Sequence, residues 1–209
     1  MPACYRGVLF DLFGTLIVFD PARLPELLLE GRRVRTTVGG LETALAEWVP
    51  GTPPPVFLEA FVAVSEEMVR AREVDHVEWP SRERFRRTLA RVGCAERWLA
   101  EAAVHLSRVH MALIAVANAL PPAHAALLEG LRPGHRIGLV SNFDDTGTAH
   151  EILFRHGITP YFDTIVVSES LGLRKPRPAA VRAGLRGLGL EAGSKPELLA
   201  GLALLQDSD

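Results

Sequence analysis

Residues 7–15 read GVLFDLFGT, a short apolar run that ends on an aspartate and a turn glycine. A brief, continuously apolar run of this kind is typical of a strand in a parallel sheet, which is buried on both faces. The pattern recurs twice. Residues 136–140 (RIGLV) lead into SNFDD, and residues 164–167 (TIVV) lead into SES. We therefore expect three parallel strands in one sheet.

Helical patterns follow the second and third of these runs. Residues 148–156 place Ile152 and Leu153 on one helical face, and Gly157 is suited to end that helix. Pro178 can occupy the first position of a later helix, since its missing N–H costs nothing there. Strand and helix alternate, which predicts right-handed βαβ units and an α/β fold with a Rossmann-like parallel sheet.

The segment between the first and second predicted strands has a different pattern. From residue 21 to residue 121 we find only helical periodicity, interrupted by glycines and prolines that divide it into pieces. An all-helical insertion at this point of a parallel sheet is expected to form a cap. We assign residues 1–20 and 122–209 to a Rossmann-like catalytic core and residues 21–121 to a helical cap.

The composition argues against several classes of partner. The chain has 209 residues and a net charge of −2, which gives no reason to expect nucleic acid or an anionic membrane as a partner. The N-terminal region has no apolar run long enough for a signal peptide or a membrane span. The two cysteines lack CxxC spacing and indicate reduced thiols. We expect a cytoplasmic protein with a small-molecule substrate, and the sequence does not indicate its oligomeric state.

Polar residues follow each predicted strand. Asp11 follows the first, Ser141 and Asn142 follow the second, and Lys175 lies eight residues past the third. Ligands of open α/β sheets bind outside the carboxyl ends of the strands, so these residues are expected to converge. A carboxylate, a hydroxyl and an ammonium group at one place can attack, hold and neutralise an anionic group.

Three segments together resemble the motifs of the haloacid dehalogenase superfamily. FDLFGTL at residues 10–16 resembles its first motif, VSN at 140–142 its second, and KPRP at 175–178 its third. Their order and spacing match the family, and the helical insertion lies where a type 1 cap would lie. The resemblance covers nearly the whole chain and implies a hydrolase.

The resemblance also implies a role for each matching residue. Asp11 would be the nucleophile that forms a covalent intermediate with the substrate, and Thr15 would orient the loop that carries it. Ser141, together with the Asn142 backbone, would bind the transferring group. Lys175 would neutralise charge on Asp11 and on the substrate, a role that suits its compact ammonium group.

The phosphatase branch of the family implies a Mg²⁺ ion, a cation that prefers hard oxygen ligands. Its protein ligands here would be Asp11, the backbone carbonyl of Phe13 and an acid of the fourth motif. The nearest candidate for that motif is the run at residues 202–205, followed by Gln206 where the family has glycine. Asp207 would then be the acid.

Phe13 departs from the phosphatase pattern, which has a second aspartate two residues after the nucleophile. That aspartate protonates the leaving group, and losing a general acid costs about 10²–10⁴-fold in rate. The 2-haloacid dehalogenases carry an aromatic residue there, and halide leaves without a proton. Phe13 therefore shifts weight toward the dehalogenases. Because the phosphatase branch of the family is far larger, our first expectation is still a Mg²⁺-dependent phosphatase, with two alternatives: a 2-haloacid dehalogenase-like hydrolase, or a non-catalytic binding relative with a truncated C-terminus.

Overall fold

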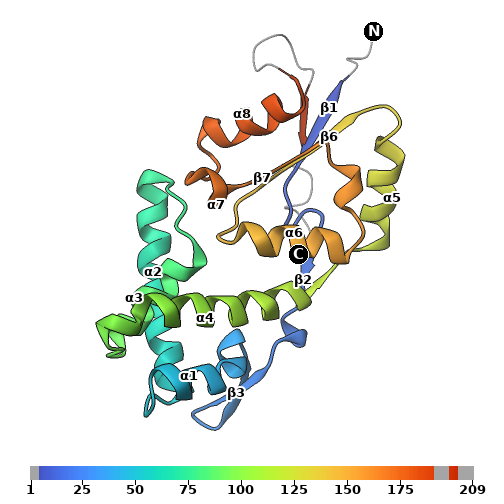
Figure 1. The fold of residues 1–209 in the computed structure, drawn as a ribbon. Helices are drawn as coiled ribbons and strands as arrows, with labels where there is room; N and C mark the ends of the chain where they lie inside the picture. Colours follow the sequence, from blue (N-terminus) through green and yellow to red (C-terminus); the bar gives the residue numbers. More distant parts are fainter. Residues whose placement is uncertain (1–4, 191–197, 202–209) are drawn as a thin grey trace. The chain divides into compact units, whose positions relative to one another are not determined.

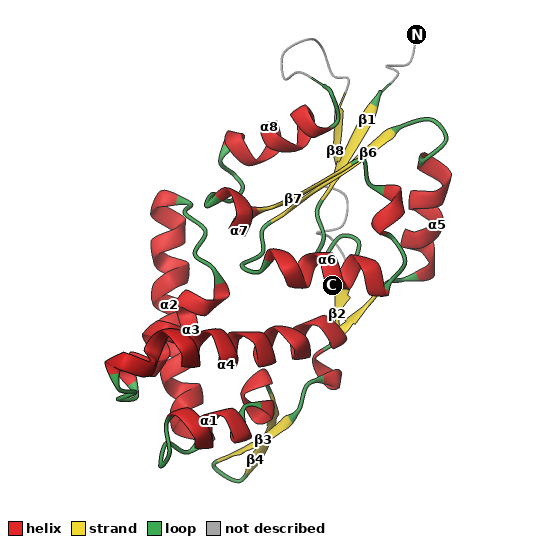
Figure 2. Ribbon diagram, in the orientation of Figure 1, coloured by secondary structure: helices red, strands yellow, loops and turns green. Residues whose placement is uncertain are grey.

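The computed structural model describes residues 5–190 and 198–201 (Figure 1). The described residues divide into a core unit (residues up to 19, 76–78 and from 118 onward) and an insertion unit (20–75 and 79–117). The core unit contains a parallel sheet in the order β7-β6-β1-β8 (Figure 2). Its strands are β1 Gly7–Phe10, β6 Arg136–Ser141, β7 Thr164–Val167 and β8 Leu198–Gly201.

The three strands predicted from the apolar runs are confirmed. A further strand, β8, pairs with β1 from Gly7↔Leu198 to Phe10↔Gly201, whereas residues 202–205, where we expected the fourth-motif strand, lie outside the described residues. β1 is therefore flanked by a strand on each side, by β6 and by β8. Gln206 and Asp207 lie outside the described residues.

The helices expected between the strands are also present in the core unit. Asp145 caps α6, because its side chain accepts a hydrogen bond from the Thr148 N–H at 2.8 Å. Pro178 is the first residue of α8, as predicted. The remaining pieces include a short antiparallel pair, β2 with β5. The bounds are β2 Val18–Phe19, β5 Asn118–Ala119, α5 Pro122–Leu131, α6 Thr146–Arg155, α7 Ser168–Leu171 and α8 Pro178–Gly187.

Gly184 permits α8 to pack closely on the sheet, and Gly138 of β6 leaves room for the Leu9 side chain of the neighbouring strand. A Cβ added to Gly184 would lie 2.5 Å from a Val140 methyl, and one added to Gly138 would lie 2.6 Å from a Leu9 methyl. Such distances are far below van der Waals contact, so a larger residue could not be placed without moving its neighbours. The apolar cluster at this contact is formed by Leu9, Val140, Ala180, Leu185, Leu188 and Leu190.

The insertion unit is mainly helical but not entirely so. Its helices are α1 Glu42–Trp48, α2 Pro54–Asp75, α3 Ser81–Arg91 and α4 Glu96–Val116. The all-helical prediction was wrong because a hairpin precedes them, formed by β3 Glu26–Leu29 and β4 Arg32–Arg35. Its turn, Glu30-Gly31, has positive φ at both residues (49° and 77°), as two-residue hairpins of type I′ require. The apolar residues of β3 are consecutive rather than alternating, so the periodicity gave no strand signal.

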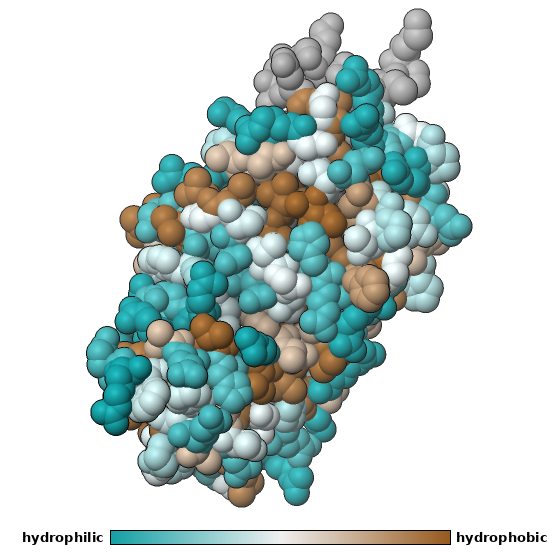
Figure 3. Space-filling view, viewed as in Figure 1, coloured by the Kyte–Doolittle hydropathy of each residue, from teal (hydrophilic) through white to brown (hydrophobic). Residues whose placement is uncertain are grey.

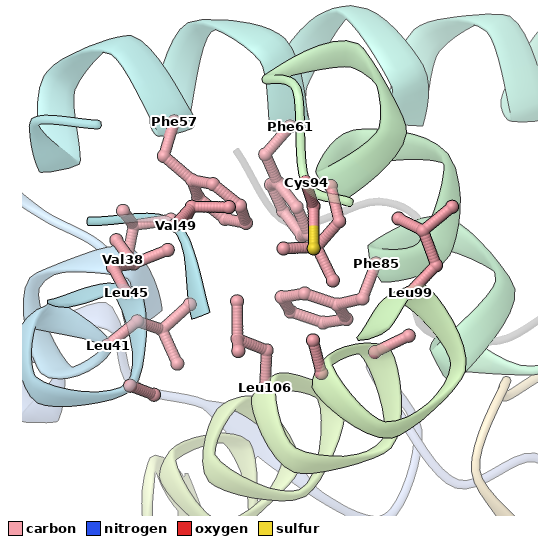
Figure 4. Close-up of a cluster of buried hydrophobic side chains, with 14 residues drawn as sticks. Val38, Leu41, Leu45, Val49, Phe57, Phe61, Phe85, Cys94, Leu99 and Leu106 are labelled. Atoms are coloured by element: carbon pink, nitrogen blue, oxygen red, sulfur yellow. The ribbon is translucent and has the colours of Figure 1, made fainter. Parts of the chain in front are cut away.

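Aromatic rings form the centre of the insertion unit. Phe57, Phe61 and Phe85 lie in one buried cluster, with ring centroids 5.1–6.4 Å apart (Figure 4). Cys94, a free thiol, belongs to the same cluster. The α4 helix contributes several of its members and is also the one described helix long and apolar enough to span a membrane, by length and composition alone. Because eight of its residues are buried within the protein, a helix of the insertion's own core explains this composition.

The chain that joins α2 to α3 returns to the core unit, which differs from the boundaries expected from the sequence. Val77 forms an antiparallel bridge with Leu173, and residues 76–78 belong to the core unit. The two crossings near residues 19–20 and 117–118 lie close to the predicted limits of 20 and 121.

On the face shown in Figure 3, hydrophilic residues separate the hydrophobic ones into small areas.

Candidate active site

The loop after β1 holds Asp11 in a tight turn. The Leu12 N–H donates to Asp11 Oδ1 at 2.7 Å, and the N–H groups of Leu16 and Ile17 both donate to the Leu12 carbonyl at 2.9 Å. Gly14 has φ of 74°, a conformation that side chains other than glycine rarely adopt. The turn thus places the Asp11 carboxylate at the carboxyl end of β1, where it is 22% exposed.

Lys175 lies beside this carboxylate. Its Nζ is 2.8 Å from Asp11 Oδ2 and donates to the Val140 carbonyl at 2.7 Å. The Lys175 side chain is only 11% exposed, so the ion pair is largely shielded from water. Interactions between charges are stronger in such surroundings than at an open surface. The structure therefore brings together the two charged residues that the sequence singled out.

Asn142 holds the backbone of Lys175 from the loop after β6. Its Oδ1 accepts from the Lys175 N–H at 2.8 Å, and its Nδ2 donates to the Lys175 carbonyl at 3.1 Å. This reciprocal pair fixes the position of the lysine main chain. The Asn142 side chain is therefore committed to Lys175, and only its backbone remains for the ligand contact implied by the resemblance.

Ser141 is the last residue of β6 and is 1% exposed. Its Oγ is buried and makes no hydrogen bond to any of the described residues. A buried hydroxyl without a partner costs about 1–3 kcal/mol, and most such groups in native proteins do have one. A hydroxyl left unsatisfied at the end of a central strand is suited to bind a ligand oxygen.

Two aromatic rings line the same pair of loops. Phe13 and Phe143 have ring centroids 4.6 Å apart and are tilted by 41°. Phe143 was not predicted from the sequence, and its position one residue after Asn142 was the available signal. Thr15 is half-buried in the turn after Asp11, and its N–H lies 3.4 Å from the Leu12 carbonyl. Its proposed role in orienting the loop remains a prediction.

The described residues do not by themselves make a Mg²⁺ site. Within residues 5–190 and 198–201, no group of three or more His, Cys, Asp or Glu side chains could hold a metal ion. Both oxygens of Asp11 already have protein partners, and Phe13 could offer only its carbonyl. Asp207, the third predicted ligand, lies outside the described residues.

The chain is similar to a family of hydrolases, to a phosphatase of known sequence and to two hydrolases of known structure. A family model for haloacid dehalogenase-like hydrolases matches residues 5–197. A phosphoglycolate phosphatase of Cereibacter sphaeroides is 29% identical over 187 residues, which is 88% of this chain and 72% of that protein. Among solved structures, a 2-haloacid dehalogenase from Pseudomonas syringae pv. Tomato DC3000 superimposes with a TM-score of 0.61 at 22% identity, covering 90% of this chain and 75% of that one. The HAD-hydrolase YfnB from Bacillus subtilis, bound to magnesium, gives 0.56 at 20% identity, covering 95% and 78%.

The two structural neighbours are below 25% identity and establish the fold, while the family model covers most of the chain. The parallel sheet and the Asp11–Lys175 pair agree with the family match over residues 5–197. The chain belongs to the haloacid dehalogenase-like hydrolase family.

Proposed function

We propose that this hydrolase acts on a small phosphate monoester through a covalent intermediate on Asp11. The observation that carries the proposal is the Asp11–Lys175 pair, 2.8 Å apart and largely shielded from water. The unsatisfied Ser141 hydroxyl supports it, since a phosphoryl oxygen can accept the Ser141 proton. The name of the curated relative, a phosphatase, favours this substrate class.

Each step of the proposed reaction uses a group of this chain. An Asp11 oxygen attacks phosphorus, the bond from phosphorus to the ester oxygen breaks, and the leaving group departs with the electron pair. Water then attacks the phosphorus of the aspartyl phosphate and the bond from phosphorus to the Asp11 oxygen breaks. One proton of the water passes to solvent, and the other stays on the released phosphate. Lys175 and Ser141 hold the phosphoryl oxygens, which carry negative charge throughout.

Phe13 determines which phosphate esters suit this site. It cannot donate a proton, and its ring packs against another hydrocarbon ring, that of Phe143. The leaving group must then depart as an anion, which favours aryl or acyl phosphates over alkyl phosphates. A general acid contributes about 10²–10⁴-fold, so the disadvantage of alkyl substrates is expected to be of this order.

The same aromatic pair supports a second candidate, 2-haloacid dehalogenation. Asp11 would attack the carbon that bears the halogen, and the carbon–halogen bond would break with release of halide. Water would then attack the Asp11 ester carbonyl and release a 2-hydroxy acid. Halide needs no proton, an apolar surface beside that carbon suits it, and no metal is required.

A cytoplasmic location and use of Mg²⁺ remain proposals.

The test is hydrolysis of a series of aryl phosphates of increasing leaving-group pKa, with Mg²⁺ or with a chelator, alongside halide release from 2-chloropropionate. We expect rates that fall steeply with leaving-group pKa and drop by about 10³-fold or more in Asp11→Asn. Glu151→Gln, an exposed change on α6, serves as the control and should match the wild type.

The other outcomes separate the candidates. Halide release without phosphatase activity would establish the second candidate. Neither activity, with orthophosphate binding unaffected by Asp11→Asn, would indicate a non-catalytic relative. Equal rates for aryl and alkyl phosphates would contradict the leaving-group argument.

A further inference from the structure

The segment between α2 and α3 is hydrogen-bonded to the chain that leads into Lys175. The Glu78 N–H donates to the Gly172 carbonyl at 3.0 Å, and the Arg174 N–H donates to the His76 carbonyl at 3.0 Å. The bridge between Val77 and Leu173 lies between these two bonds. A few residues from the middle of the insertion are therefore built into the core unit, next to the active-site lysine.

Glu78 places a buried carboxylate in this segment. Its side chain is 1% exposed, and its Oε2 accepts a hydrogen bond from Ser168 Oγ at 2.7 Å. Arg174 Nη1 lies 3.5 Å from the same oxygen and balances its charge. Carboxylates are rarely this buried unless they are paired, so the position requires an explanation.

Ser168, the first residue of α7, connects Glu78 to the active site. Its Oγ accepts a hydrogen bond from the Phe143 N–H at 2.9 Å and lies 3.2 Å from the Phe143 carbonyl. A serine hydroxyl has one proton to donate, and an ionised carboxylate accepts hydrogen bonds but cannot donate one. With Glu78 present the proton is directed to the carboxylate, and the lone pairs of the oxygen face the Phe143 N–H. Without Glu78, the hydroxyl proton can turn to the Phe143 carbonyl. The hydroxyl then rotates, and the hydrogen bond that it accepts from the Phe143 N–H is weakened.

Ser141, Asn142 and Phe143 form the loop in which the proposed phosphoryl group binds. Asn142 fixes this loop on one side through Lys175, and Ser168 fixes it on the other through the Phe143 backbone. We propose that Glu78 is a positioning residue: by orienting the Ser168 hydroxyl it sets the backbone of residues 141–143. The inference rests on the proposed function for its effect on the reaction.

Four variants, Ser168→Ala and the three that follow, separate orientation of the hydroxyl from general stability. Glu78→Ala removes the acceptor, Glu78→Gln keeps an acceptor oxygen without the charge, and Arg174→Gln removes the ion pair alone. We expect Glu78→Ala and Ser168→Ala to lower kcat on an aryl phosphate by about 10–10²-fold, because small misplacements of reacting groups have effects of this size. Glu78→Gln should recover most of the loss, and Arg174→Gln should stay within about threefold of the wild type.

Hydrogen exchange at the Phe143 amide gives a second readout that needs no activity. Exchange should accelerate in Glu78→Ala and Ser168→Ala but not in Glu78→Gln, and affinity for orthophosphate should fall in parallel. If the wild type proves inactive while this pattern appears, the link between Glu78 and the loop stands and the proposed function fails. Unchanged kcat and unchanged Phe143 exchange in Glu78→Ala and Ser168→Ala would overturn the inference. If Glu78→Ala does not fold, unchanged values in Ser168→Ala would overturn it alone, because the proposed effect of Glu78 passes through the Ser168 hydroxyl.

Discussion

Lys175 is held by groups from two other segments of the core unit. Asn142 fixes its main chain, the Val140 carbonyl accepts from its ammonium group, and Asp11 lies 2.8 Å from the same nitrogen. A lysine ammonium is a compact charge on a flexible stem, so its usefulness depends on being held in this way. The sequence predicted the residue, whereas the groups that hold it became apparent only in the fold.

Removing the Lys175 charge is expected to slow the reaction without unfolding the protein. Lys175→Met should lower kcat by about 10²–10³-fold, the usual effect of losing one group that stabilises developing charge. Lys175→Arg should give partial activity, because the guanidinium keeps the charge but not the shape. Steady-state kinetics would check this, with the exposed Arg155→Gln as control. A Lys175→Met enzyme within threefold of the wild type would contradict the assignment.

At the scale of elements, the sequence predicted the three strands with continuously apolar sequence but not the β3–β4 hairpin or the position of β8. The runs at residues 7–10, 136–140 and 164–167 became β1, β6 and β7. β1 and β6 are almost entirely buried, as a continuously apolar run predicts, and β7, at the end of the strand order, is partly buried. The β3–β4 hairpin was missed because its turn geometry, not its periodicity, determines it. β8 was not predicted, because its register is set by pairing with β1, and a run of leucines and alanines does not specify where pairing starts.

The contact of α8 with the sheet gives a prediction about stability. Gly184→Ala should destabilise the core unit by about 1–3 kcal/mol, because the new methyl would overlap Val140 and Leu9 side chains. Gly130→Ala is the matched change in another helix, where a Cβ meets nothing within 4 Å, and it should be neutral or stabilising by up to about 1 kcal/mol. Chemical unfolding of both variants would test this. Equal effects at the two glycines would show that α8 can shift to accommodate the methyl.

At the scale of the whole molecule, a buried histidine in the insertion unit is expected to make stability depend on pH. The insertion unit buries His110, whose Nδ1 lies 2.7 Å from Thr37 Oγ1 and whose ring packs against Phe61 and Phe85. Burial, with a smaller contribution from the Arg84 charge, lowers the pKa of His110 to about 3. The histidine is therefore neutral in the folded unit at pH values where it would be protonated in the unfolded chain.

The pH dependence follows from the direction of this shift. Between the ordinary histidine pKa of about 6.5 and the folded value, the unfolded chain binds one more proton, so the free energy of unfolding falls as pH decreases. From pH 7 to pH 5 the expected loss is about 2 kcal/mol. Glu83, whose pKa is lowered to about 2 by hydrogen bonding to Arg86, affects stability only at more acid pH.

Urea unfolding of the insertion unit within the intact chain, at pH 5 and pH 7, would measure this loss. His110→Gln should abolish most of the difference between the two pH values, whatever its effect on absolute stability. His150→Gln, at an exposed position on α6, should retain the difference. A variant lacking His110 that remains equally acid-sensitive would assign the effect to other groups.

The sequence by itself determined the α/β core and the presence of an insertion after the first strand, and it indicated Asp11, Ser141 and Lys175 as candidate site residues in the segments that end or follow the strands. These depend on short-range patterns and on the rule that parallel strands end at one edge. Only the tertiary structure decided the Asn142 clamp, the Phe13–Phe143 contact and the Glu78–Ser168 hydrogen bond. The partners of that last bond are 90 residues apart, and it forms because a backbone bridge brings the two segments together, which no local pattern encodes.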